Sequence, residues 1–263
     1  MAATDATHLG LVMLAAAAGG VINSIAGGGT LLTFPALIGL GIPGLAANAT
    51  STVALWPGAA GSIVGYRREL AGMRPWAIRF AVPSVLGGLA GALLLLRTSA
   101  ERFEQLMPWL VIGASALFVI QRPLMAWIRA WDIKRGVDLT LSEPSETPSL
   151  KVLLYQFGVG VYGGYFGAGI GILMLAALGF MGFTNIHKMN GLKNWGGLCT
   201  NVVAAATFAV SGIVIWPVAG AMAVGAIAGG YGGSLMAQRV PQQRVRQAIT
   251  FIGFASGIWL LIR

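Results

Sequence analysis

The residues that could do chemistry inside the apolar part of this chain are a lysine and several asparagines on one segment, 189–210. On a helix with 100° per residue, Asn190, Asn194 and Asn201 lie within about 40° of one another. Lys193 lies beside them. This polar stripe on an otherwise apolar helix predicts an anion site that lines a cavity. The simpler alternative is that Lys193 snorkels to a membrane interface while the asparagines hydrogen-bond to neighbouring helices.

The acidic residues all lie outside the apolar segments. No carboxylate is therefore available inside those segments for a proton relay or for binding a cation. This absence favours an anionic or neutral ligand. The eight acidic residues are Asp5, Glu69, Glu101, Glu104, Asp132, Asp138, Glu143 and Glu146.

Two glycine clusters interrupt apolar runs, AGGGT at 26–30 and FGAGIG at 166–171. Unwound backbone there would expose N–H groups, and the N-terminus of a half-helix stabilises an anion through its dipole. Paired interruptions of this kind point to the binding site of a transporter. Close helix packing is the alternative role for the same glycines. The candidate binding residues in and near these clusters are Asn23, Gly27, Gly28, Gly29, Thr50, Ser51, Gly167 and Gly169.

Motifs of enzymes and metal proteins are absent from the sequence. There is no GxxxxGK[ST] phosphate loop, and the GxGxxG match at 158–163 lies in an apolar segment with no acid about 20 residues on. His8 and His187 are too few for a histidine-based metal site, and the single Cys199 excludes an internal disulfide. The sequence therefore predicts no catalytic residues, no metal and no cofactor.

The composition is that of a membrane protein. The 263 residues are 56% hydrophobic and 10% charged, with a mean hydropathy of +0.78. A soluble domain carries about 25% charged residues. The net charge of +9 lies mostly at segment ends, as topology-setting charges do, so nucleic acid is not an expected partner. We expect an all-α polytopic membrane protein.

The sequence also matches itself when shifted by 140 residues without a gap. This register predicts two repeats, residues 1–122 and 151–263, separated by a charged linker at 123–150. The matched pairs are Gly20/Gly160, Gly27/Gly167, Gly29/Gly169, Gly39/Gly179, Gly72/Gly212, Trp76/Trp216 and Gly113/Gly253.

Each repeat contains about five apolar segments. The second segment of each is too short to span easily, so we expect a broken or re-entrant helix there. In the linker, Met125–Lys134 could form an amphipathic helix at the membrane surface, anchored by Trp127 and Trp131. The predicted segments are 8–26, 30–42, 46–66, 75–97 and 105–122, then 151–168, 170–182, 189–210, 213–237 and 246–262.

Equivalent loops of the two repeats alternate in charge. Loop 66–75 carries three arginines and one acid, whereas its counterpart 206–215 carries no charge. Loop 97–104 is balanced, whereas 237–247 carries three arginines and no acid. Because positive loops stay in the cytoplasm, the alternation predicts repeats of inverted orientation, an outward N-terminus and a cytoplasmic linker.

The segment from AGGGT through GIP to the ATSTVALWPG helix and its basic end resembles the opening motif of the sulfite exporter TauE/SafE family of anion permeases. FGAGIG followed by NGLKN resembles that family's second motif, and the resemblance runs from about Gly10 to Ile262. The family's second motif often has Ser or Thr where this chain has Gly191, which bears on substrate identity. Carried over by position, the motif residues are Gly27, Gly28, Gly29, Thr50, Ser51, Gly167, Gly169, Asn190, Lys193 and Asn194.

The resemblance implies a secondary transporter, an exporter of sulfite or organosulfonates coupled to protons or to the membrane potential. A passive anion channel and a permease for small carboxylates are the alternatives. A membrane-embedded scaffold is disfavoured by the repeat. The expected location is the bacterial plasma membrane, where the partners are a small anion and the lipid bilayer, and a homodimer stays open.

Overall fold

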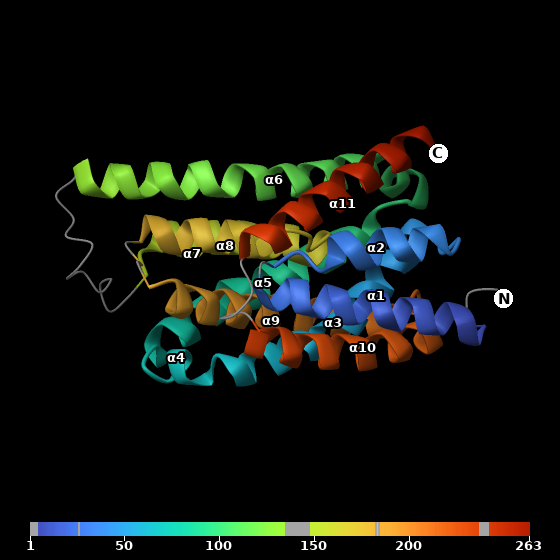
Figure 1. Ribbon diagram of the computed structural model, residues 1–263, viewed down its shortest axis with the longest axis horizontal. Coiled ribbons are helices and arrows are strands. Elements are labelled where there is room, and N and C mark those ends of the chain that lie inside the picture. The colour runs from blue at the N-terminus through green and yellow to red at the C-terminus, as the bar shows by residue number, and fades with distance from the viewer. Residues whose placement is uncertain (1–4, 26, 135–147, 182, 184, 237–241) are drawn as a thin grey trace.

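The computed structural model describes residues 5–25, 27–134, 148–181, 183, 185–236 and 242–263. All regular structure in these residues is helical (Figure 1). The helices are α1 (Ala6–Ile25), α2 (Thr30–Gly39), α3 (Gly44–Gly65), α4 (Arg67–Ala71), α5 (Arg74–Arg97), α6 (Ala100–Lys134), α7 (Leu150–Tyr165), α8 (Ile170–Phe180), α9 (Ile186–Ser211), α10 (Trp216–Met236) and α11 (Gln242–Ile262).

The helices confirm the expected class of multi-pass membrane protein. Among the described residues, five helical stretches are long and apolar enough to cross a bilayer, in α1, α5, α6, α10 and α11. Nine of the ten predicted segments coincide with a helix to within a few residues, and the exception is 105–122, which lies within the longer helix α6. The short helix α4 was not predicted, and it lies in the basic loop after α3.

Helix α6 differs most from its predicted segment. It continues without interruption to Lys134, so Met125–Lys134 is the end of a 35-residue helix rather than a separate surface helix. Such a helix is about 52 Å long, well beyond a hydrocarbon core of about 30 Å. Its end extends past the other helices (Figure 1). The rest of the predicted linker, 135–147, lies outside the described residues.

The projecting part of α6 carries an aromatic cluster. The rings of Trp127 and Trp131 stack with centroids 6.1 Å apart and planes 5° apart. Both rings meet the edge of Phe180 at the end of α8, at 6.1 and 6.5 Å. Helix α8 therefore ends beside the projecting part of α6.

Two helical hairpins enter the bundle from opposite ends. Helix α1 runs inward and breaks after Ile25, and α2 returns toward the end that carries the N-terminus (Figure 1). Helix α7 runs inward from the other end, and α8 returns there (Figure 1). Glycine permits both breaks, since φ is +75° at Gly27 and +77° at Gly169, a region that other residues rarely adopt.

Six helices pack in two groups of three, and each group mixes the predicted repeats. In the α1–α3–α10 group, a Cβ added to Gly20 would lie 2.7 Å from the Ala226 carbonyl oxygen of α10. In the α5–α7–α9 group, a Cβ added to Gly88 would lie 2.7 Å from the Thr200 carbonyl oxygen of α9. Because glycine lets these backbones approach closely, each group is tightly packed.

Candidate functional site

The break between α1 and α2 meets the first turn of α8 beside Lys193. A Cβ added to Gly27 would lie 3.2 Å from Cα of Gly171 and 3.9 Å from Cδ of Lys193. A Cβ added to Gly171 would lie 3.1 Å from the same Cδ. The aliphatic stem of the lysine therefore lies across the contact between the α1–α2 break and the first turn of α8.

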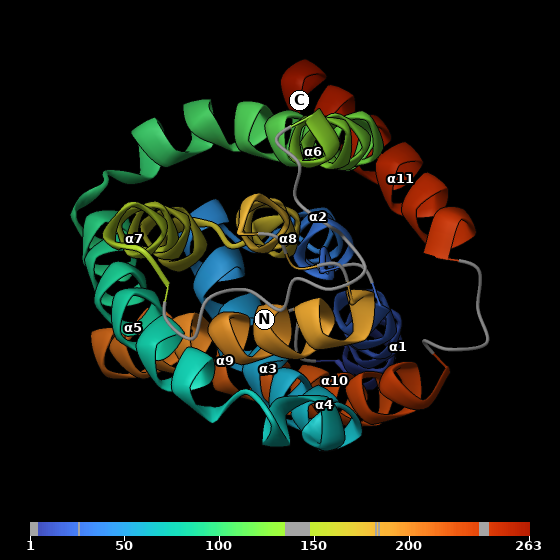
Figure 2. The same ribbon diagram turned by 90° about the vertical axis from the view of Figure 1, so that its left-hand side faces the viewer.

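A small cavity of about 30 Å³ adjoins this contact, and we name it the Lys193 cavity. This volume is close to the share of one water molecule in the liquid. Four helices and one break contribute to its wall, and Figure 2 shows the hairpin helices end-on with α9 alongside. The lining residues are Asn23, Gly27, Ala59, Ser62, Ile170, Gly171, Lys193, Asn194, Gly197 and Asn201.

Lys193 is the one charged residue among those ten. It is only 3% exposed, and its Nζ has no hydrogen-bond partner among the described residues. An ammonium group buried without a counter-charge costs several kcal/mol. The cavity therefore favours a bound negative charge.

Three amide side chains line the same cavity as Lys193. The Asn194 side chain is 8% exposed, and its Nδ2 also has no hydrogen-bond partner within the described part of the chain. Asn201 lies two turns further along α9, and Asn23 lies near the end of α1. The cavity thus combines a cation with uncommitted N–H donors, which is the donor set that recognises an oxyanion.

The register of α9 places these side chains. Asn185 caps the helix, because its Oδ1 accepts hydrogen bonds from the N–H groups of His187 and Lys188 at 3.0 and 3.2 Å. With the start fixed there, Lys193 lies about two turns into the helix. The polar stripe predicted from the sequence faces the cavity at Lys193, Asn194 and Asn201.

Ser62 is a lining residue that sequence reasoning missed. Its hydroxyl lies within hydrogen-bond distance of the carbonyl oxygens of Gly58 and Gly230, at 3.2 and 3.3 Å. A signal for it existed, since position 62 falls one residue from the position matched to Asn201 under the 140-residue shift. Gly171 was also missed, although it belongs to the second glycine cluster.

Thr50 and Ser51 lie outside the lining of the Lys193 cavity. The Thr50 hydroxyl oxygen accepts a hydrogen bond from the N–H of Ile215 at 3.1 Å. The hydroxyls of Ser51 and Thr33 are 2.7 Å apart. Both hydroxyls therefore contribute to packing between elements.

The remaining candidate residues do not line the cavity either. Gly28 packs on the Phe118 ring, and Gly29 packs on the backbone of Gly19. Gly169 precedes the first turn of α8, and Gly167 has φ of +82°. Asn190 is buried one turn before Asn194.

Metal chemistry finds no donor set here. The described residues contain no group of three or more His, Cys, Asp or Glu side chains. Cys199 is a free, partly buried thiol.

The profile of the family described as "Sulfite exporter TauE/SafE" matches residues 12–260. The chain belongs to this family. It is therefore a membrane transporter and not an enzyme.

Relatives of this TauE/SafE chain carry names of the same kind. "Probable membrane transporter protein YfcA" of Escherichia coli K12 is 29% identical over 256 residues, covering 96% of this chain and 89% of the relative. "Probable membrane transporter protein" of Haemophilus influenzae is 28% identical over 236 residues, covering 89% and 86%. "Probable membrane transporter protein ORF9" of Sinorhizobium sp. is 28% identical over 254 residues, covering 96% and 92%. No solved structure matches the chain significantly.

Proposed function

We propose that this transporter exports sulfite or small organosulfonates and binds them in the Lys193 cavity. The observation that carries the proposal is the buried Nζ of Lys193, which has no hydrogen-bond partner among the described residues. The lysine side chain lies where the α1–α2 break meets the first turn of α8. The Nδ2 of Asn194 adds a second free donor beside it. A sulfonate or sulfite group offers three oxygens, which can meet an ammonium and several N–H donors together.

The small volume of the cavity fits a closed intermediate of alternating access. About 30 Å³ holds roughly one water molecule, so a larger anion needs the hairpins to separate. The contact between Gly27 and Gly171 is the natural place for this separation, because the two glycines belong to hairpins that open toward opposite ends. Anion binding would neutralise Lys193 and stabilise the closed form.

The opposed hairpins also support an inverted repeat. The α1–α2 hairpin opens toward one end of the molecule and the α7–α8 hairpin toward the other (Figure 1). Two half-sites of opposite direction that meet at one cavity are the arrangement expected of secondary transporters. The repeats would be residues 1–122 and 151–263.

The moving units would be the two packed groups rather than the two repeats. The α1–α3–α10 group and the α5–α7–α9 group each contain helices from both repeats, joined by backbone contact at glycines. The Lys193 cavity lies between them, since α3 supplies Ser62 and α9 supplies Lys193. Rocking of one group against the other would open the cavity to alternate ends.

The charges at the two ends support an orientation. At the end with α4 and the start of α7, Arg67, Arg68, Arg74 and Lys151 outnumber the one acid of α4, Glu69. At the opposite end, Asp5, Glu101 and Glu104 offset Arg97, Arg102 and Arg263. By the positive-inside rule the α4 end would be cytoplasmic and the N-terminus would face outward.

Coupling of transport to protons would depend on the substrate itself. None of the ten lining residues is a carboxylate, so a transported proton would have to travel on the anion, on Lys193 or through water. Sulfite is the anion of a weak acid and can carry a proton itself, as hydrogensulfite. Net export of charge would also respond to the membrane potential.

Transport in proteoliposomes tests the proposal. Purified protein should give saturable uptake of radiolabelled sulfite, and Lys193→Met should reduce kcat/KM at least tenfold. Lys188→Met, a lysine of the same helix outside the cavity lining, is the matched control and should transport as the wild type does.

Three outcomes would overturn the proposal. Equal transport by Lys193→Met and the wild type would place the site elsewhere. Flux that neither saturates nor shows counterflow with unlabelled anion would indicate a channel. Preference for acetate or another small carboxylate over every sulfur anion tested would change the substrate class.

A further inference from the structure

A second and much larger pocket lies at the end of the molecule where α2 and α11 have their C-terminal ends. Its volume is about 450 Å³, within the range of small-molecule sites. Its wall is formed by α2, the turn before α3, α6 and the end of α11. We name it the end pocket, and it shares no lining residue with the Lys193 cavity.

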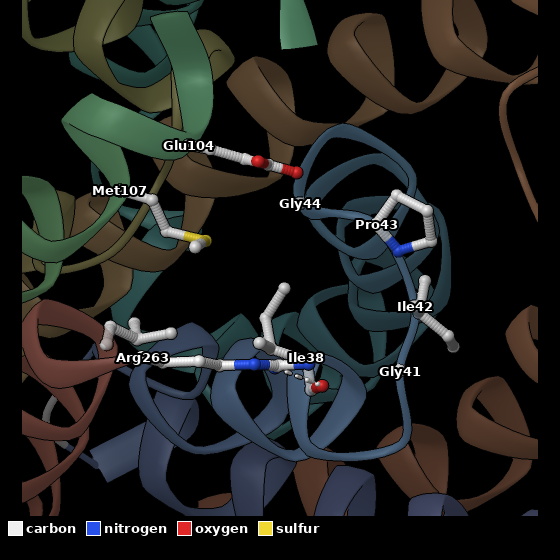
Figure 3. A pocket seen from close by; sticks show the side chains of 9 residues that line it. Ile38, Gly41, Ile42, Pro43, Gly44, Glu104, Met107 and Arg263 are labelled. Atoms are coloured by element: carbon white, nitrogen blue, oxygen red, sulfur yellow. Dashed lines mark hydrogen bonds between the residues drawn. The ribbon is translucent and has the colours of Figure 1, made fainter. Parts of the chain in front are cut away.

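Opposite charges face each other across the end pocket. Figure 3 shows the Glu104 carboxylate and the Met107 sulfur pointing into it from α6, with the Arg263 side chain on the opposite side. No ion pair joins Glu104 to Arg263 in the described structure. When two opposite charges line one pocket without forming an ion pair, a ligand that carries one charge of each sign can pair with both.

The Arg263 side chain is held in place. Its Nη1 donates a hydrogen bond to the Ile38 carbonyl oxygen at 3.1 Å, and its guanidinium carbon lies 5.4 Å from the centroid of the Trp259 ring. A guanidinium has five N–H groups, so donors remain for an anionic ligand group. Ile38, Met107 and Leu260 supply an apolar wall that suits a short carbon chain.

We propose that the end pocket binds a small zwitterion, with its ammonium group at Glu104 and its anionic group at Arg263. A free zwitterion from solution and the headgroup of phosphatidylethanolamine both have this chemistry. The site is independent of anion binding at Lys193.

Binding of radiolabelled β-alanine to delipidated protein in detergent tests the first source. Its matched competitors are propionate and propylamine, which each lack one of the two charges. We expect β-alanine to bind at least tenfold more tightly than either competitor. Glu104→Gln and Arg263→Gln should each weaken β-alanine binding at least tenfold.

Neighbouring residues supply the controls. Glu101→Gln and Arg102→Gln alter exposed charges of α6 that do not line the pocket, and should leave the affinity within twofold. Lys193→Met should also bind β-alanine normally, which separates this site from the transport site. Native mass spectrometry of protein from mixed phosphatidylethanolamine and phosphatidylglycerol bilayers tests the second source.

Retention of phosphatidylethanolamine by the wild type, and its loss in Glu104→Gln, would identify the lipid headgroup as the ligand. Selective β-alanine binding without such retention would assign a free zwitterion. Equal binding of β-alanine and propionate, or neither β-alanine binding nor selective lipid retention, would overturn the proposal.

Discussion

The substitution Gly171→Ala adds one methyl group at the contact between the two hairpins. The new Cβ would lie 3.1 Å from Cδ of Lys193 and 3.2 Å from Cα of Gly27. Ordinary carbon–carbon contacts are about 3.5–4.0 Å, so each neighbour must move by roughly 0.4 Å. The backbone of residue 171 itself accepts alanine, because its φ is not positive.

The expected cost follows from this overlap. An extra methyl group in a packed interior costs about 1–3 kcal/mol, which corresponds to a roughly 5- to 150-fold change in a rate. The strain falls on the closed conformation, in which the hairpins touch beside Lys193. Because conformations with separated hairpins escape the strain, we expect a lower transport rate with little loss of folded protein.

Initial rates of sulfite uptake in proteoliposomes and thermal unfolding in detergent together measure this effect. Gly158→Ala on α7 is the control, since a Cβ there meets no atom within 4 Å. The control should match the wild type, whereas Gly171→Ala should lose at least fivefold in transport at an unchanged melting temperature. Wild-type transport by Gly171→Ala would refute the closed contact as part of the cycle.

Three further predictions concern the site and the packed groups. In Asn194→Leu, loss of the free Nδ2 donor should raise KM for sulfite by roughly five- to tenfold, which corresponds to about 1 kcal/mol or slightly more. Unchanged uptake kinetics would show that Asn194 is not part of the site. Gly229→Val should fail to give monodisperse protein on size-exclusion chromatography, because its side chain would clash with the backbone of Ala17. Gly220→Val on the same helix is the control and should fold, because a Cβ there meets no atom within 4 Å. In a Cys199→Ser background, cysteines at Gly61 and Tyr231 would have Cβ atoms 3.8 Å apart, suited to a disulfide between α3 and α10. Oxidation should leave transport within twofold of the reduced protein; a block of transport would contradict movement of the α1–α3–α10 group as one unit.

Much of the helical layout was predictable from the sequence because the relevant signals are local. Long apolar runs set the helices, and glycine clusters mark where α1 and α7 break. The assembly of α10 with α1 and α3 was not predictable, since close glycine contacts between distant segments leave no local trace. The continuation of α6 to Lys134 was also missed, because the charged residues after 122 were assigned to a linker.

The candidate site shows the same division. Lys193 was conspicuous as a charge inside an apolar segment, and the structure buries it in the wall of a cavity. Thr50 and Ser51 were also polar candidates, but residue type does not reveal which neighbour a hydroxyl meets. Both hydroxyls hydrogen-bond to neighbouring elements within the packing. Gly171 could not be singled out within its glycine cluster, since only its contact with Lys193 distinguishes it.

The central claim is that the Lys193 ammonium group binds the transported anion. Equilibrium binding of radiolabelled sulfite to purified wild-type, Lys193→Met and Lys188→Met protein at neutral pH tests it most directly. We predict that Lys193→Met binds at least tenfold more weakly than the wild type while Lys188→Met binds within twofold of it. Equal sulfite affinity in all three proteins would contradict the claim.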